Sequence, residues 1–243
     1  MMMEQEHKRQ DMKIAGAGSA SGGYYNKVRI DGAGRVDGDV DCESFVINGS
    51  ANVSGSVATQ SMVVNGSGSV KGSLQSEDLE VAGNLNIKGN LRSRSIGIDG
   101  HTSVKGDSES ESLEVNGNLR VHGDVRSEKA TFNGLFNIDG RLHVGSAHIQ
   151  VLGRSIAREI VGDRITVRRK GQRFWDMLSI NLRGNRLEAR VIEGDVLDLE
   201  YVEADIVRGN RVILGKGCQV RQVEYRDEYN QHPEAEVGAS DRI

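Results

Sequence analysis

From Lys27 onwards, apolar and polar residues alternate along the chain with a period of two. Alternation of this kind is typical of β-strands that bury one face, whereas an amphipathic helix repeats its apolar positions about every 3.6 residues. Glycine interrupts the alternation at regular intervals. The pattern therefore predicts an all-β protein built from short strands, and it excludes a helical one.

The alternation itself repeats every 17 residues. Seven gapless blocks span residues 27 to 145, and the second block reads SFVINGSANVSGSVATQ. Positions 2, 4, 10 and 14 of the block are apolar in nearly every copy. Positions 6 and 12 are always glycine, which marks bends with positive φ or places where a Cβ would collide with the interior. These two columns hold Gly32, Gly49, Gly66, Gly83, Gly100, Gly117 and Gly134, and Gly38, Gly55, Gly72, Gly89, Gly106, Gly123 and Gly140.

Two strand architectures compete for this repeat. Asn-Gly at positions 5 and 6, as in Asn48-Gly49, is a signal for a two-residue hairpin turn and would suit an antiparallel meander. A meander gives no reason for each strand to reproduce its predecessor column by column. A parallel β-helix does, because each position stacks on its own copy one coil away. We therefore expect a parallel β-helix, and at about 3.3 Å per residue a 17-residue coil makes three short strands around a triangular cross-section.

Two further columns describe the interior. Position 8 changes from Gly34 in the first block to Phe136 in the last, so larger groups should fill the solenoid towards its C-terminal coils. Position 16 is a column of mostly hydroxyl-bearing residues, which predicts either an inward ladder with hydrogen bonds between coils or a polar corner. Its members are Cys42, Thr59, Ser76, Ser93, Ser110, Ser127 and Val144.

The repeat divides the chain into four segments. A flexible tail is expected over residues 1–10, and regular β-helix over 11–145, as one 16-residue coil followed by seven 17-residue coils. In the short first coil, positions 4 to 14 are matched by Ile14, Gly16, Gly18, Ala20, Gly22 and Tyr24. Residues 146–225 should continue the β-helix irregularly. Residues 226–243 contain Pro233 and no apolar rhythm, which predicts a disordered tail.

Charge becomes uneven after Gly145. Residues 146–190 contain ten Lys and Arg against four acids, while 191–207 contain six acids and no base. The first interpretation is that neighbouring coils pair these charges across their outer faces. The second concerns a basic and aromatic excursion near residues 168–184, which either covers the flank or end of the solenoid or makes peripheral contact with an anionic membrane. Its candidate contact residues are Arg168, Arg169, Lys170, Arg173, Phe174 and Trp175.

Catalytic and metal chemistry find little support. The histidines within the repeats fall at different block positions, so no column stacks them into a metal site. We therefore expect no enzymatic activity, cofactor or metal. The net charge of -4 speaks against nucleic acid as a partner. With two cysteines, a charged N-terminus and no long apolar stretch, the sequence predicts a cytoplasmic protein, and any membrane association would be at the inner face.

The ends of such a solenoid expose unpaired backbone groups, which proteins normally protect with charge, proline or a capping helix. No helix or proline is evident before the first coil. Stacking of two ends would satisfy the free hydrogen bonds and bury the terminal side chains. The residues expected to form these self-assembly ends are Ile14, Tyr24 and Tyr25 at one end, and Val220, Val223 and Tyr225 at the other.

Coils of the type VxIxGxxxVxGxV, together with the C-terminal stretch ADIVRGNRVILGKGCQVRQVEY, resemble the bactofilins, bacterial polymer-forming cytoskeletal proteins. The resemblance covers roughly residues 11 to 225. It implies a right-handed β-helix that assembles without nucleotide into non-polar filaments, through contacts between like ends. It also implies a scaffold for cell shape, motility or envelope-associated machinery, with itself, other bactofilins and envelope or motility proteins as partners.

Two rival classes predict other patterns. A left-handed β-helix acyltransferase should show hexapeptide repeats summing to 18 residues per coil and a catalytic histidine beside a protruding loop. A surface adhesin or carbohydrate-processing β-helix should show a secretion signal and longer coils with acidic clusters. The 17-residue period and the charged N-terminus favour the scaffold.

Overall fold

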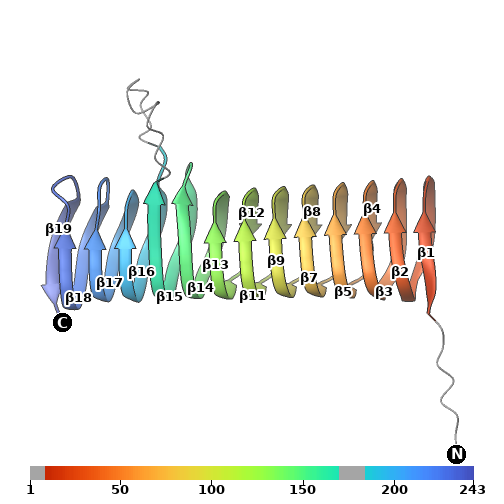
Figure 1. Ribbon diagram of the computed structural model, residues 1–243, viewed down its shortest axis with the longest axis horizontal. Coiled ribbons are helices and arrows are strands. Elements are labelled where there is room, and N and C mark those ends of the chain that lie inside the picture. Colours follow the sequence, from red (N-terminus) through yellow and green to blue (C-terminus); the bar gives the residue numbers. More distant parts are fainter. Residues whose placement is uncertain (1–8, 170–183) are drawn as a thin grey trace, which may run out of the picture.

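The computed structural model describes residues 9–169 and 184–243. In this part the chain is a parallel β-helix of about 13 turns, drawn out along one axis with the first coil at one end and the last at the other (Figure 1). Every strand pair is parallel, which confirms the β-helix and excludes the meander. Among the described residues, no helix is long and apolar enough to cross a bilayer.

The strands change in length along the solenoid. Short strands alternate with longer ones in the regular coils, and long strands of 13 to 17 residues form most of the C-terminal part. Their bounds are β1 Gln10–Ile14, β2 Ala17–Ile30, β3 Ala33–Ile47, β4 Ser50–Val53, β5 Val57–Val64, β6 Ser67–Val70, β7 Leu74–Val81, β8 Asn84–Ile87, β9 Leu91–Ile98, β10 His101–Val104, β11 Ser108–Val115, β12 Asn118–Val121, β13 Val125–Phe132, β14 Leu135–Val151, β15 Ser155–Arg169, β16 Leu187–Leu199, β17 Val202–Leu214, β18 Gln219–Gln231 and β19 Glu236–Arg242.

Each regular coil has three faces, and each face sends two side chains into the interior. We name them by block position: face A covers positions 17 to 4, face B positions 7 to 11 and face C positions 13 to 16. The four-residue strands β4, β6, β8, β10 and β12 lie on face B, and the eight-residue strands bend at a corner to form faces C and A. The burial pattern therefore fits the expected triangular coil, as the second block shows with Phe45 and Ile47, Ala51 and Val53, and Val57 and Thr59.

Asparagine side chains stack at the corner between faces A and B. Asn48 Nδ2 donates to Asp31 Oδ1 at 2.7 Å, and Asn65 Nδ2 donates to Asn48 Oδ1 at 2.8 Å. Each bond joins one coil to the next. The Asn-Gly pairs that could signal hairpin turns are therefore rungs of a ladder along the solenoid axis.

The two glycine columns are explained by close approach, since Gly38 alone among their members has a positive φ. A Cβ on Gly66 at position 6 would overlap the carbonyl oxygen of Gly49 in the preceding coil. At position 12, a Cβ on Gly123 would overlap the carboxylate of Asp107, which turns in against the corner. Glycine at these positions lets successive backbones stack in direct contact.

Of the two alternatives for position 16, the structure has the inward hydroxyl ladder. Ser76 Oγ donates to Ser93 Oγ at 2.9 Å, and Ser110 Oγ donates to Ser127 Oγ at 3.1 Å. Position 16 is therefore inward-facing. The buried side chains at position 8 become larger towards the C-terminal coils, as expected. There Phe136 packs on Phe132 with ring centroids 4.4 Å apart.

Coil length varies once the glycine columns end. Arg141 pairs with Glu159 at an offset of 18 residues, Gly162 with Gly194 at 32, and Gly194 with Gly209 at 15. The large offset shows that β16 stacks directly beside β15, although residues 170–186 lie between them in sequence (Figure 1). Of the basic and aromatic excursion expected near residues 168–184, residues 170–183 lie outside the described residues.

The prediction of a disordered tail over residues 226–243 is wrong. β18 continues to Gln231, and β19 pairs with β18 in parallel, with Glu236 N donating to Cys218 O at 2.9 Å. Backbone pairing along an existing strand holds this coil although its side chains show no apolar alternation. Ala235 is its one buried side chain.

Tyr24 also departs from expectation. The register between β2 and β3 shifts by one residue between Ser21 and Gly23, so that Gly23 rather than Tyr24 takes position 14. Tyr24 therefore points outwards and is 74% exposed.

Candidate functional site at the ends of the solenoid

The N-terminal end is an open strand edge. β1 and the first part of β2 have a neighbouring coil on one side only within the described residues. Met12 and Ile14, which fill the interior of this coil, are 8% and 9% exposed, whereas Val28 and Ile30 one coil further in are 1% and 0% exposed. The end of the core is thinly covered at this edge.

The same edge carries unmatched hydrogen-bond donors. At the next corner inwards, Asp31 N donates to Ile14 O at 2.8 Å and Ala33 N donates to Gly16 O at 3.0 Å. The equivalent N–H groups of Ala15 and Ala17 have no preceding coil in the described part of the chain. The edge can therefore donate to another backbone.

Tyr24 lies on the outer flank of the first coil, whereas Tyr25 takes position 16 and packs against the core. The Arg9 guanidinium is 5.8 Å from the centre of the Tyr24 ring and donates to Asp41 Oδ1 at 2.8 Å. Tyr25 is half-buried, and its hydroxyl donates to Ser21 O at 2.7 Å. Of the three residues expected at this end, Ile14 and Tyr25 contact the core, and Tyr24 points outwards.

The C-terminal end differs from expectation. Val220 and Val223 are buried, and they pair with Val237 and Ser240 of β19. Tyr225 is half-buried and stacks on Tyr229, with ring centroids 5.2 Å apart. The three residues expected at this end therefore lie one coil inside it, because β19 covers them.

β19 itself forms the terminal edge. All its residues except the half-buried Val237 are exposed, and both signs of charge are present, in Glu236, Asp241 and Arg242. Pro233 precedes it. Charge and proline are common protections of a strand edge. β1 also carries exposed charges, in Asp11 and Lys13, so the proline beside β19 is what distinguishes the two edges.

The two described residues of the basic and aromatic segment are used within the molecule. Arg168 forms a hydrogen-bonded ion pair with Asp198, which raises the pKa of the guanidinium, and Arg168 Nε is 3.8 Å from Glu200 Oε1. The Arg169 guanidinium lies 4.7 Å from the centre of the Tyr201 ring. The other four candidate residues, Lys170, Arg173, Phe174 and Trp175, lie outside the described part of the chain.

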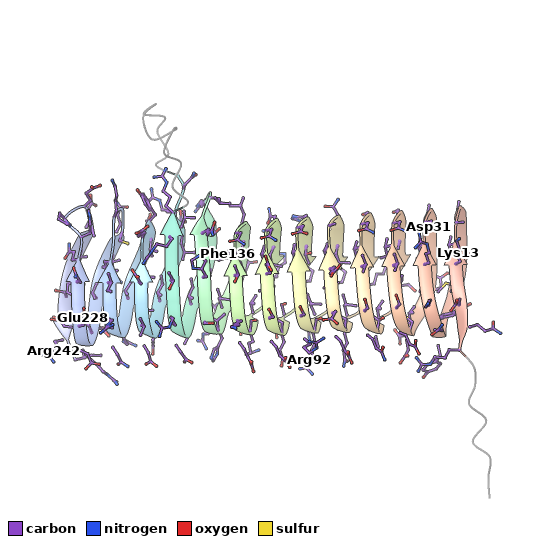
Figure 2. The ribbon with its side chains drawn as sticks, in the orientation of Figure 1. Lys13, Asp31, Arg92, Phe136, Glu228 and Arg242 are labelled. Atoms are coloured by element: carbon purple, nitrogen blue, oxygen red, sulfur yellow. The ribbon has the colours of Figure 1, made fainter. Side chains whose placement is uncertain are left out.

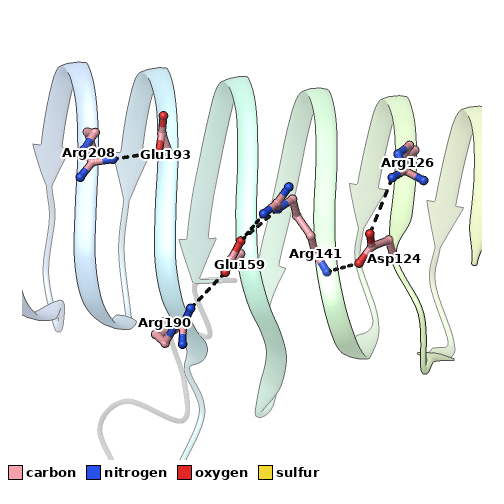
Figure 3. A network of polar contacts seen from close by, with 7 residues as sticks. All are labelled: Asp124, Arg126, Arg141, Glu159, Arg190, Glu193 and Arg208. Carbon is pink, nitrogen blue, oxygen red and sulfur yellow. Dashed lines mark hydrogen bonds and ion pairs between the residues drawn. The ribbon is translucent and has the colours of Figure 1, made fainter.

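Opposite charges pair across neighbouring coils, as the first interpretation predicted. Glu159 accepts hydrogen bonds from Arg141 at 2.8 Å and from Arg190 at 3.2 Å, and Arg208 contacts Glu193 at 3.3 Å (Figure 3). The bond from Arg141 lowers the pKa of the Glu159 carboxyl. Side chains cover the outer faces along the whole solenoid (Figure 2), and ion pairs between coils occupy the C-terminal part densely.

Groups suited to catalysis do not gather in the described residues. No cluster of three or more His, Cys, Asp or Glu side chains there is placed to hold a metal ion. Cys42 and Cys218 are free and buried, and burial raises the pKa of the Cys218 thiol to about 11. A buried, protonated thiol is a poor nucleophile.

A further ladder, at position 13, escaped the sequence analysis. The side chain of each member accepts the backbone N–H of the next: Asp107 N donates to Asn90 Oδ1 at 3.0 Å, and Asp124 N to Asp107 Oδ1 at 2.8 Å. The signal was present, because position 13 is Asp, Ser or Asn in six successive blocks. These are Asp39, Ser56, Ser73, Asn90, Asp107 and Asp124.

Comparison with known proteins adds a family to this geometry. A family model described as Bactofilin, polymer-forming cytoskeletal, matches residues 7–109 and 60–143. The uncharacterized protein YhbE of Bacillus subtilis (strain 168) is 46% identical over 57 residues, which cover 24% of each chain. The uncharacterized protein YhbF of the same organism is 35% identical over 98 residues, covering 40% of this chain and 37% of that one.

The chain thus spans well under half the length of the curated relatives it matches. No solved structure matches it. The two overlapping family matches together cover more than half of the chain, and they fall on the glycine-bounded coils whose columns build the solenoid. The chain therefore belongs to the bactofilin family of polymer-forming cytoskeletal proteins.

Proposed function

We propose that this protein is a non-enzymatic scaffold whose subunits polymerise by end-to-end stacking of their β-helices, without nucleotide. The filaments would organise cell shape, motility or envelope-associated machinery in the cytoplasm, together with other bactofilins and with envelope or motility proteins. The observation that supports end stacking best is the open space beside Gly16.

Gly16 holds position 6 of the first coil. At each of the seven later copies of this position, a Cβ would overlap a carbonyl oxygen of the coil before it. A Cβ on Gly16 would meet no described atom within 4 Å, and the residue does not have a positive φ. Nothing in the described part of one subunit requires glycine at this point. Close approach of another subunit's backbone would require it.

Stacking would also provide hydrogen-bond acceptors for the backbone N–H groups at this edge. The free N–H groups of Ala15 and Ala17 would gain acceptors, each bond adding about 0.5 to 1.5 kcal/mol net. Met12 and Ile14 would lose their remaining exposure. The two ends of a filament subunit must both make contacts, so β19 would form the second interface through its exposed backbone edge and its mixed charges.

The test is a pair of glycine variants in the full chain. Gly16→Ala should keep the melting temperature of the parent protein but abolish filaments in electron microscopy and in high-speed pelleting. Gly97→Ala is the matched control, because a Cβ there would come no closer than 3.9 Å to Leu79 O, and it should still polymerise. Addition of ATP or GTP should change neither result.

Filaments of Gly16→Ala indistinguishable from those of the parent would refute the proposed use of this edge. A parent protein that stayed monomeric at every salt concentration and pH would refute polymerisation itself. In cells, a fluorescent fusion of the full chain should form discrete structures at a pole, septum or membrane patch, and Gly16→Ala should render it diffuse.

A further inference from the structure

Face B of the middle coils is basic. Its outward residues, at positions 7, 9 and 11, include no carboxylate from Ser50 to His122. The chain as a whole has a net charge of -4, so this face runs against the overall balance. Its cations are Lys71, Lys88, Lys105 and Arg120, all exposed.

The lysines form a row along the axis. Val70, Ile87 and Val104, which precede them, are register partners in successive coils, so neighbouring lysines lie about 4.8 Å apart at the backbone. Within the described residues, Lys71 and Lys88 make no ion pair, and Lys105 Nζ contacts His122 Nε2 at 2.9 Å. Like charges at this spacing repel one another, and an opposite row would relieve that repulsion.

Face A of nearly the same coils is acidic. Its carboxylates outnumber its cations, Arg94 and Lys129, and Arg94 is paired with Asp78 at 3.0 Å. The other carboxylates of this face have no cationic partner in the described part of the chain. They are Glu77, Glu80, Glu111, Glu114 and Glu128.

Face C behaves differently. Arg92 and Glu109 in successive coils form an ion pair at 2.7 Å, and Arg126 lies 3.7 Å from Asp124. Both cations of face C are thus paired within the molecule. Most of the unpaired cations of the middle coils lie on face B, and most of the unpaired carboxylates lie on face A.

We propose that these filaments associate side by side, with face B of one copy against face A of the next. The inference rests on the proposed end-to-end filament, which repeats both faces along its length. Because both rows belong to the same β-helix, they share one axial spacing. The cations of face B can therefore meet the carboxylates that face A carries at residues 77–80, 111–114 and 128. The contact joins two different surfaces, so each added filament offers a fresh face and association continues into bundles.

A second copy fits face B better than an anionic bilayer does. No large apolar or aromatic side chain projects from face B between Ser50 and His122 to enter a membrane. The net charge of the chain opposes an anionic surface. A bilayer would also leave the carboxylates of face A unmatched.

The test compares two double variants of the full chain with equal change in charge. Lys71→Gln/Lys88→Gln removes two cations of the row on face B, and Arg92→Gln/Arg126→Gln removes two cations of face C. Low-speed pelleting measures bundles, and high-speed pelleting with electron microscopy measures filaments.

The parent should bundle at low salt and disperse into single filaments at high salt, because salt screens exposed charges. The face B variant should lose bundles several-fold at low salt and keep its filaments, while the control bundles like the parent.

A reciprocal exchange sharpens the result. Lys71→Glu/Lys88→Glu/Lys105→Glu and Glu77→Lys/Glu111→Lys/Glu128→Lys should each fail to bundle alone, and a mixture of the two should bundle again. Unchanged bundling of the face B variant, equal loss in the control, or no rescue on mixing overturns the proposal. The proposal is also overturned if the face B variant bundles like the parent but no longer binds phosphatidylglycerol vesicles that the parent binds.

Failure of the two proposals is distinguishable. Single filaments that never bundle refute side-by-side association alone. Absence of filaments at any salt refutes end stacking. In that case light scattering of single subunits decides the lateral contact: association at low salt that depends on face B upholds it, and its absence refutes it.

Discussion

The carboxylate of Glu159 on β15 lies 3.2 Å from the guanidinium of Arg190 on β16, although 31 residues separate them in sequence. Residues 170–186 lie between β15 and β16 in sequence, and this contact joins the two paired coils directly (Figure 3). Arg141 of β14 holds the other side of the same carboxylate. Glu159 thus connects three successive coils where the repeat is interrupted.

Glu159→Gln should lower the melting temperature at neutral pH by roughly 1 to 3 °C. The bond from Arg141 holds the pKa of Glu159 below its ordinary value. The stabilisation is therefore fully present above the pKa of the unfolded chain, and it is lost as the pH falls through the lower folded value. Thermal melts between pH 7 and pH 3 should show the difference from the parent shrinking with acid. Glu128→Gln, which removes an exposed carboxylate, should show no such convergence.

Gly66→Ala should be among the most damaging single methyl additions in the regular coils. The new Cβ would overlap the carbonyl oxygen of Gly49, a backbone atom that cannot move alone. We expect a loss of about 3 kcal/mol or more in the free energy of unfolding, measured by denaturant titration. Gly97→Ala adds the same group where the nearest atom is 3.9 Å away, and it should fall within about 0.5 kcal/mol of the parent. Equal effects of the two variants would contradict the packing explanation.

Asp107→Ala should break one rung of the position 13 ladder. Asp124 N would lose its acceptor at 2.8 Å, at a cost of about 1 kcal/mol. Asp107→Asn retains an oxygen acceptor, as Asn90 does in the preceding coil, and should restore most of the stability. Hydrogen exchange at the Asp124 amide gives the local readout, and unchanged protection in the alanine variant would count against the ladder.

Thr102→Val should stabilise the protein. The Thr102 side chain is fully buried at position 8, and its Oγ1 has no hydrogen-bond partner in the described part of the chain. Valine has nearly the same shape without the polar atom, so we expect a gain of about 1 kcal/mol in the free energy of unfolding.

Ser93→Ala is the contrasting variant, because Ser93 Oγ accepts from Ser76 and donates to Ser95 O at 2.9 Å. It should destabilise the protein, and a stabilising Ser93→Ala beside a neutral Thr102→Val would reverse the expected order of the two hydroxyls.

The regular coils were predictable because a strict period leaves little freedom. Once Val53 and Val70 fall in one column, parallel stacking places each on the next, and the structure has this register. The first coil was harder. Its missing residue falls in a run of small residues around Gly22 and Gly23, where side chains carry no information on register, and Tyr24 was assigned inwards as a result.

The C-terminal end shows a different limit. Alternation reveals a strand that buries one face, but β19 lies at the edge and has no buried side chain, since Ala235 just precedes it. The position of β19 depends on backbone pairing with β18, and the pattern of apolar and polar side chains does not reveal such pairing. Val220 and Val223 were therefore assigned to an end that lies one coil further on. The proposed edge at Gly16 was visible in sequence as a glycine column, but its open side required coordinates.

The stacking of each coil on its two neighbours has a consequence for size. Adding or removing one 17-residue block would lengthen or shorten the subunit by about 4.8 Å while leaving both terminal coils unchanged. In an end-to-end polymer, the axial repeat of the filament would then change in steps of one coil. The gene could thus set the spacing of anything attached along the filament by duplicating or deleting a 51-base-pair unit.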